Sequence, residues 1–381
     1  MKNEARILAN FDIDPVRGFL PADDPLASLP EVFSDLEDIA QNFSAYFLSG
    51  RLREAVQDIS IGAEIESLTT AGEQQRAMLL LSMLASAFVW CCKEPAVKIP
   101  ANISIPWQYV AEKTGRPMIV VHAAVVLNNW RRFDTDKPLS LENLDTLQTF
   151  LGGIDEKWFY LVTVMVEAAG AAALPALVEI RSAINTGDTA GMTQRLESVA
   201  AAVRNMQRML ERMPEHCDPH IFYHRVRPFL QGWPAPGIIY EGVSDSPQML
   251  FGGSAAQSSL LQSIDAGLTI THHHPQTSDF LLEMRRYMPP NHRRFIETLE
   301  NGPSVREFVS KKKTTHPTLA GAYNQCIQAI DAFRKKHIEI TVQYILEQSP
   351  EKSSAKGTGG TTFMQFLSHA KRETKGKMIG F

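Results

Sequence analysis

The chain has 381 residues, of which 44% are hydrophobic, enough to bury a large core and, by length, two or three domains. Its 38 lysines and arginines against 42 acids give a net charge of −4, which argues against nucleic acid or an anionic membrane as a partner. The spacing of Cys91, Cys92, Cys217 and Cys326 fits neither a metal site nor a disulfide framework, so we expect reduced thiols in a cytoplasmic protein.

No membrane-spanning or secretory segment is expected. The N-terminal residues mix acids and bases and lack the apolar run of a secretory signal. Residues 77–92 are apolar but shorter than the roughly 20 residues that a span needs. Residues 158–177 are long enough, but Glu167 lies at their middle and Pro175 near their end. We predict that both segments are core helices.

Helical periodicity dominates the chain, and the alternating apolar and polar runs typical of sheets are almost absent. The fold class is therefore predicted to be all-α. Amphipathic helices are predicted over residues 30–49, 71–92, 189–213, 278–287 and 319–346. Asp188 or Thr189 is the expected N-cap of the third.

Polar, irregular stretches separate these helices. Residues 131–142 are a candidate connector, which divides the chain into a smaller N-terminal helical domain, 1–135, and a large one, 136–381. Residues 231–258 are rich in glycine, proline and serine, and residues 347–360, rich in serine, glycine and lysine, are predicted to form a mobile surface loop.

The helix predicted over residues 319–346 carries the most informative pattern. Its apolar residues step by threes and fours along one buried stripe that contains His337. A buried imidazole without a partner costs roughly 1–3 kcal/mol, so His337 must hydrogen-bond or bind a ligand such as haem iron. Arg334, one turn earlier, could pair with a haem propionate. Spacing alone leaves the choice open, and a core histidine bonded to a backbone carbonyl is the commoner case.

Two glycine-rich loops and a histidine triplet are further candidates. Residues 357–361 (GTGGT) suit a carboxylate or phosphate, and residues 252–259 (GGSAAQSS) would let backbone approach a flat ligand. A flexible linker and a capping loop are the respective alternatives. His272, His273 and His274 lack an acid or cysteine at ligand spacing, so we predict a solvated loop there rather than a metal site.

Several segments resemble, in order, the indoleamine 2,3-dioxygenase family. They are LNNWRRFDTDKPLSLEN, FYLVTVMVEAAGAAALP, FYHRVRPFLQGW, IIYEGV with GGSAAQSS, FLLEMRRYMPPNHRRFIETLE, PSVREFV, FRKKHIEI and AKGTGGT. The agreement runs from about residue 117 to residue 362, and the first hundred residues match only loosely. The resemblance implies two helical domains, with haem b (and its iron) in the larger one and the smaller one capping the distal side.

The resemblance also assigns cofactor-binding residues. His337 matches the proximal iron ligand, Arg334 the arginine beside a haem propionate, and Asp265 the acidic partner of that arginine. Ser254 and Ala255 match residues along the haem edge.

The substrate-binding residues follow in the same way. Phe159 and Thr163 match positions that touch the indole, Phe222 matches a ring-packing phenylalanine, and Arg227 matches the arginine that binds the substrate carboxylate. Pro228 disfavours α geometry at Arg227, so we expect the helix to break there.

The remaining substrate positions include departures from the family pattern. Thr358 matches a residue that closes over the amino-acid part of the substrate. His122 replaces an aromatic residue, Val125 a small thiol, and Ala256 a glycine. A neutral His122 could accept a hydrogen bond from the indole N–H, or it could only fill space and bond a backbone carbonyl.

The implied reaction inserts O2 across the indole C2–C3 bond of L-tryptophan, or a related indole, and gives N-formylkynurenine. It requires ferrous haem and therefore an electron donor. One alternative is a related haem enzyme acting on a modified indole of secondary metabolism. Another is a haem-binding sensor without turnover, against which the retention of Arg227 and Thr358 argues.

Overall fold

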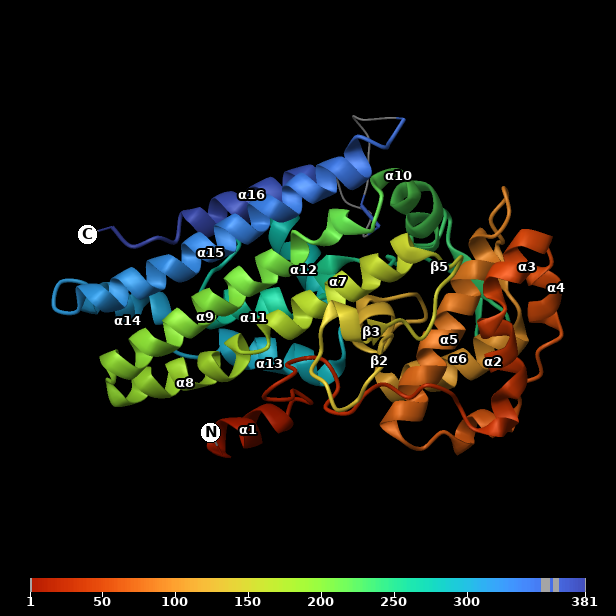
Figure 1. Cartoon of the computed structure of the whole chain (residues 1–381), viewed down its shortest axis with the longest axis horizontal. Helices are drawn as coiled ribbons and strands as arrows, with labels where there is room; N and C mark the ends of the chain where they lie inside the picture. The colour runs from red at the N-terminus through yellow and green to blue at the C-terminus, as the bar shows by residue number, and fades with distance from the viewer. Residues whose placement is uncertain (1, 351–356, 359–362, 381) are drawn as a thin grey trace.

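Figure 1 shows the computed structural model of the chain, which describes residues 2–350, 357–358 and 363–380. The fold is all-α, as predicted, with only short strands among the helices. Its centre is α9 (Thr189–Leu210), which packs against α7 (Ile154–Gly170), α8 (Ala173–Thr186) and α15 (Pro317–Thr341). Asp188 is the N-cap of α9 and accepts a hydrogen bond from the Gly191 N–H at 2.9 Å, as expected.

The segment Ile154–Thr186 is the one described stretch that is long and apolar enough to cross a membrane. It consists of two helices, α7 and α8, which both pack on α9, as core helices of a soluble globular protein do. The prediction of one continuous helix over residues 158–177 is therefore wrong, although both helices do belong to the core. Pro175 lies in the first turn of α8, where its missing N–H costs nothing, and therefore marks a new helix.

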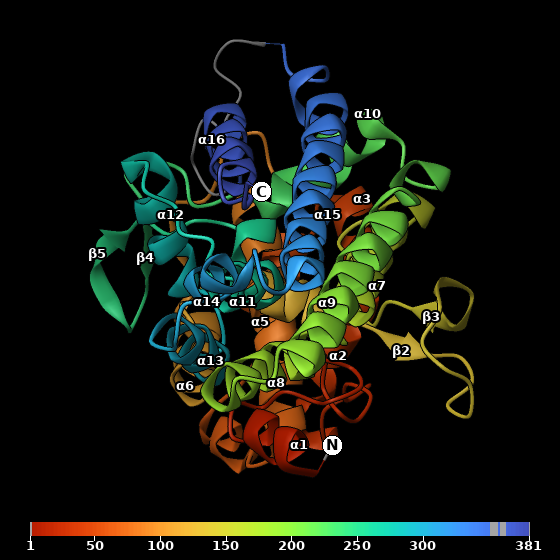
Figure 2. The same cartoon turned by 90° about the vertical axis from the view of Figure 1, so that its left-hand side faces the viewer.

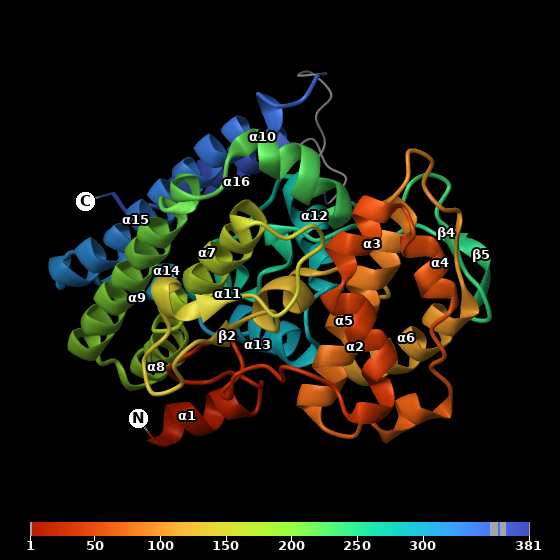
Figure 3. The same ribbon diagram turned by 45° about the vertical axis from the view of Figure 1, so that its right-hand side comes forward.

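The helices from α2 to α6 form one end of the molecule, whereas α1 lies apart from them against α8 (Figure 3). The buried helix α5 (Ala71–Trp90) packs against α2 (Ser34–Gln41), α4 (Leu52–Gln57) and α6 (Ala101–Thr114). The helix predicted over residues 30–49 is instead broken into η1 (Glu31–Phe33), α2 and α3 (Phe43–Ser49). The break lies at Asn42, whose side chain donates to the Asp38 carbonyl at 2.8 Å and competes with the helical backbone.

The C-terminal helix α16 (Phe363–Lys375) runs alongside α15 (Figure 2). α15 ends in a π-helical turn, η9 (Val342–Leu346), so the stretch predicted as one helix changes its winding near the cavity described below. The remaining helices are α1 (Lys2–Ala9), η2 (Ala63–Ser67), η3 (Ala123–Leu127), η4 (Leu141–Asn143), η5 (Met213–Glu215), α10 (Pro219–Ile221), η6 (Phe222–Val226), η7 (Arg227–Leu230), η8 (Ala255–Gln257), α11 (Ser259–Gly267), α12 (Pro275–Arg285), α13 (Pro290–Glu300) and α14 (Val305–Lys312).

The described chain also contains two small sheets, and three of their strands, β2, β4 and β5, lie in stretches that the sequence marks as irregular. In one, β4 (Ile238–Tyr240) lies between β1 (Lys98–Ile99), which is parallel to it, and β5 (Ser244–Gln248), which is antiparallel. In the other, β2 (Arg131–Arg132) pairs with β3 (Leu144–Asp145). The buried apolar side chains form one cluster that extends through both halves of the chain, and the domain boundary at residues 135–136 stays a prediction.

Candidate functional site

A cavity lies among α7, η3, η6, α15 and η9, and α9 packs against both α7 and α15. The cavity volume is about 250 Å³, close to the lower end of the range of about 300–1,000 Å³ that is common for ligand pockets. Its lining includes His122, Phe159, Thr163, Phe222, Arg227, Ser254, Ala255, His337 and Thr358.

His337 reaches this cavity from α15, between Phe333 and Ile340. No described residue forms a hydrogen bond with its imidazole, so the bond to a backbone carbonyl considered above is not formed within the described chain. Burial, aided by the positive charge of Arg334, lowers the pKa of His337 to about 4. The ring is therefore neutral near pH 7, the form that binds a metal ion.

The described residues contain no group of three or more histidines, cysteines or acids able to hold a metal ion. A single imidazole at a mostly apolar cavity instead fits an iron whose other ligands come from a porphyrin. The residues present thus fit haem, with His337 as the protein ligand.

Arg334 and Asp265 do not line the cavity. The Arg334 guanidinium is 6% exposed, pairs with the Asp265 carboxylate of α11 and contacts the Thr374 hydroxyl of α16. Burial raises the pKa of Asp265, but the charge of Arg334 and a hydrogen bond from His272 outweigh burial and keep this pKa below its ordinary value. The charged pair is thereby held between α11, α15 and α16.

The prediction of a solvated histidine loop is wrong for His272. Its side chain is 6% exposed, with Nε2 3.2 Å from Asp265 Oδ2 and Nδ1 2.9 Å from Glu373 Oε2. Asp265 lies seven residues before His272, which is not a metal-ligand spacing, and Glu373 lies on α16, 101 residues further along the chain. His273, in contrast, is exposed as expected.

Aromatic side chains line the part of the cavity beside α7. The ring centroids of Phe159 and Phe222 lie 4.6 Å apart, and those of Phe222 and Tyr344 lie 5.8 Å apart. Thr163, one turn after Phe159, donates its hydroxyl proton to the Phe159 carbonyl at 2.8 Å, so this proton is not available to a ligand. This region suits a flat aromatic molecule.

Arg227 lines the cavity, whereas Arg225 is exposed. The guanidinium lies 5.2 Å from the centre of the Tyr223 ring, and burial lowers the pKa of Arg227. The expected loss of α geometry at this residue is wrong, because its φ is −55° and its ψ −37°. The helix changes from a π turn to a 3-10 turn there, and Pro228 occupies the first turn of η7, where it needs no N–H.

The two glycine-rich loops meet at the cavity. Thr358 donates its hydroxyl to the Gly253 carbonyl at 2.6 Å, and the Gly252 N–H donates to the Thr358 carbonyl at 3.2 Å. A Cβ at Gly252 would lie 2.1 Å from the Leu230 carbonyl oxygen, so only glycine fits there. Residues 351–356 and 359–360 of the predicted mobile loop lie outside the described residues.

The bond from His122 to a backbone carbonyl, one of the two interpretations made from the sequence, is wrong, whereas acceptance of a hydrogen bond from the indole N–H stays a prediction. Its Nε2 lies 2.9 Å from Oε1 of Glu167, and both side chains are buried. Glu167 entered the sequence analysis only as an argument against a membrane span. Its position one turn after Thr163 on a helix expected to face the site was the signal that could have identified it.

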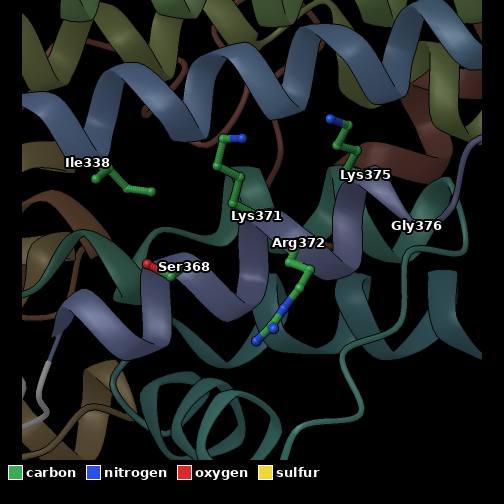
Figure 4. Close-up of a pocket in the computed structure, with 6 residues that line it drawn as sticks. All are labelled: Ile338, Ser368, Lys371, Arg372, Lys375 and Gly376. Carbon is green, nitrogen blue, oxygen red and sulfur yellow. The ribbon is translucent and has the colours of Figure 1, made fainter.

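A second pocket lies outside this site, between α15 and α16 (Figure 4). It is lined by Ile338, Ser368, Lys371, Arg372, Lys375 and Gly376. His337 and Ile338 thus border different spaces, and none of the predicted site residues lines this outer pocket.

Comparison with known proteins identifies the family. The family model described as indoleamine 2,3-dioxygenase matches residues 7–377. The chain belongs to the indoleamine 2,3-dioxygenase family. The match also covers the first hundred residues, where the motifs alone showed only a loose resemblance.

Individual relatives of this indoleamine 2,3-dioxygenase family member align over nearly their full lengths. The chain is 36% identical to indoleamine 2,3-dioxygenase 1 of Rattus norvegicus, over 99% of this chain and 97% of the relative. It is 31% identical to indoleamine 2,3-dioxygenase of Saccharomyces cerevisiae, over 97% and 93%. It is also 31% identical to a protein named myoglobin from Haliotis madaka, over 97% and 98%. As a family member the chain is a haem dioxygenase of the tryptophan/indoleamine type, and its cofactor is haem b with iron.

Proposed function

We propose that this haem dioxygenase inserts both atoms of O2 across the indole C2–C3 bond of L-tryptophan, or of a related indoleamine, to give N-formylkynurenine. The observation that carries the proposal is the combination in one cavity of His337, an aromatic pair and the cationic Arg227. Tryptophan combines an indole ring, which matches the aromatic pair, with a carboxylate, which matches Arg227. When bound, haem supplies O2 binding and the oxidative chemistry.

On the cofactor side, we propose that His337 binds the iron and that Ser254 lies along the haem edge. The neutral imidazole and its lack of a hydrogen-bond partner among the described residues support this role. Arg334, held by Asp265, would supply positive charge on the propionate side.

On the substrate side, Phe159 and Phe222 would hold the indole flat, with Thr163 and Ala255 completing the wall. Arg227 would bind the carboxylate through two parallel N–H groups, which fixes the orientation of the ring as well as its position. Thr358, hydrogen-bonded to the loop at Gly253, would close over the amino-acid part. The same closure would exclude water from the cavity.

The cellular setting belongs to the same proposal. The four cysteines are free, which suits a reduced cytoplasm. There an electron donor would keep the haem iron ferrous, and neither nucleic acid nor a membrane is part of the proposal.

Reversible O2 binding without turnover is a second candidate. The observation that favours it is the relative named myoglobin, which is as similar to this chain as the yeast dioxygenase is. A modified indole as substrate is the remaining alternative, and the departures His122 and Val125 in the cavity wall favour it.

One experiment separates these functions. Reduced, haem-loaded protein is mixed with L-tryptophan under isotopically labelled O2, and the product is analysed by absorbance and mass spectrometry. We expect N-formylkynurenine that carries both labelled oxygen atoms. A stable oxygenated haem with no product would contradict the proposal and favour O2 binding, and product from a substituted indole alone would favour the modified substrate.

A further inference from the structure

The cavity wall contains a histidine that is paired with a buried carboxylate. His122 directly precedes η3, which packs against α7, and its Nε2 lies 2.9 Å from Oε1 of Glu167 on α7. The side chains are 5% and 3% exposed. The same Oε1 accepts a hydrogen bond from the Ser258 hydroxyl at 2.5 Å. His122 thus lines the cavity, and Glu167 behind it connects the His122 ring to α7 and to the start of α11.

Four hydroxyl groups in this wall donate to the backbone. Those of Thr163, Thr341, Tyr344 and Thr358 donate to the carbonyls of Phe159, His337, Cys217 and Gly253. These four hydroxyls have no further proton to donate to a ligand, although their oxygens can still accept a hydrogen bond. His122 also lines the cavity, and its ring has a second nitrogen that forms no hydrogen bond with any described residue.

Glu167 also determines which ring nitrogen of His122 can accept a hydrogen bond. Because Glu167 Oε1 is an acceptor, Nε2 of His122 carries a proton, and in the neutral form of the ring Nδ1 has the free lone pair. The backbone of His122 is held as well, since its N–H donates to Gln257 Oε1 at 3.0 Å. The acceptor atom is therefore fixed in position relative to the cavity.

We propose that His122 determines substrate specificity by accepting a hydrogen bond from the ring N–H of a bound indole through Nδ1, and that Glu167 is the positioning residue that orients its ring. The inference rests on the proposed function, since it assumes an indole in this cavity. Acceptance of the indole N–H is one of the two interpretations made from the sequence, and the structure adds Glu167 as the residue that contacts the ring of His122.

The test compares L-tryptophan with L-3-benzothienylalanine, in which sulfur replaces the ring N–H with little change of shape. Dissociation constants are measured with haem-loaded protein by calorimetry, so that turnover is not required. We expect wild type to prefer tryptophan roughly three- to tenfold, as one neutral hydrogen bond allows. In His122→Phe and in Glu167→Leu the preference should fall to about one, while Glu167→Gln, whose amide oxygen can still accept from Nε2, should keep most of it.

Glu156→Gln is the matched control. Glu156 is the other buried acid of α7, 1% exposed, but its carboxylate accepts backbone N–H groups of residues 150–152 and does not line the cavity. This variant should keep the wild-type preference. A loss of preference in it would overturn the inference, because it would show that any buried charge of α7 affects selectivity.

The remaining outcomes test either the inference or the proposed function. Equal affinity of wild type for the two ligands, or a preference that survives in His122→Phe, overturns the inference while the proposed function stands. Wild type that binds neither ligand contradicts the proposed function itself. If Glu167→Leu does not fold, Glu167→Asp replaces it, because the shorter side chain withdraws the carboxylate from Nε2, and an unchanged preference there would overturn the role of Glu167.

Discussion

Removal of the Arg227 guanidinium should weaken tryptophan binding without removing the haem. Arg227 belongs to η7 and lines the cavity, whereas the proposed iron ligand belongs to α15. A charge-assisted hydrogen bond contributes about 1.5–3 kcal/mol, which corresponds to a loss of affinity of roughly 10- to 150-fold in Arg227→Ala. Arg227→Lys keeps the charge without the bidentate geometry and should lie between that variant and wild type.

The assay is the dissociation constant of L-tryptophan, with the Soret band measured in the same samples to report haem content. Arg225→Ala is the control, because Arg225 lies two residues earlier and is exposed. It should change the affinity less than about twofold. A large loss in Arg225→Ala together with wild-type affinity in Arg227→Ala would refute the reasoning.

Three further predictions concern the surroundings of the site. Burial raises the pKa of Glu156 from 4.5 to about 7, so its contribution to stability is complete below pH 4.5 and is lost as the pH rises through 7. Denaturation at several pH values should therefore show wild type losing about 3 kcal/mol relative to Glu156→Gln over that window, and parallel pH profiles would contradict this. Asp265→Ala leaves Arg334 buried without its carboxylate, so the free energy of unfolding in urea should fall by about 3–5 kcal/mol, and a fall below about 1 kcal/mol would show that the pair is unimportant. Thr358→Val removes the hydrogen bond to Gly253 and should raise KM for tryptophan about two- to tenfold at unchanged haem content, whereas an unchanged KM would separate Thr358 from substrate binding.

Much of the helical architecture could be predicted because it follows from local patterns. The apolar stripe of α15 and the cap at Asp188 depend on residues three and four apart, which lie on one face of a helix wherever it packs. The break at Asn42 and the strands of two to five residues could not be predicted, since such short features have no periodicity. The winding change at Arg227 follows from tertiary packing that overrides the bias of one proline.

Contacts in the site between residues far apart in the sequence could not be predicted either. The motif resemblance identified the residues that line the cavity, but it did not say what holds them. His122 meets Glu167 45 residues away, and His272 meets Glu373 101 residues away. Periodicity states which face of a helix is buried, not which other helix that face meets, so these pairs became visible only in three dimensions.

The central claim is that His337 binds the haem iron, and the most direct test is the haem content of His337→Ala. Wild type and variant are purified in parallel, and bound haem per chain is measured from the Soret band. His292→Ala is the control, because His292 is also buried, at 5% exposure, but packs against Phe19 away from the cavity. We predict that His337→Ala loses most of its haem, that added imidazole restores part of it, and that His292→Ala keeps the wild-type content. Normal haem content with an unchanged Soret band in His337→Ala would contradict the account.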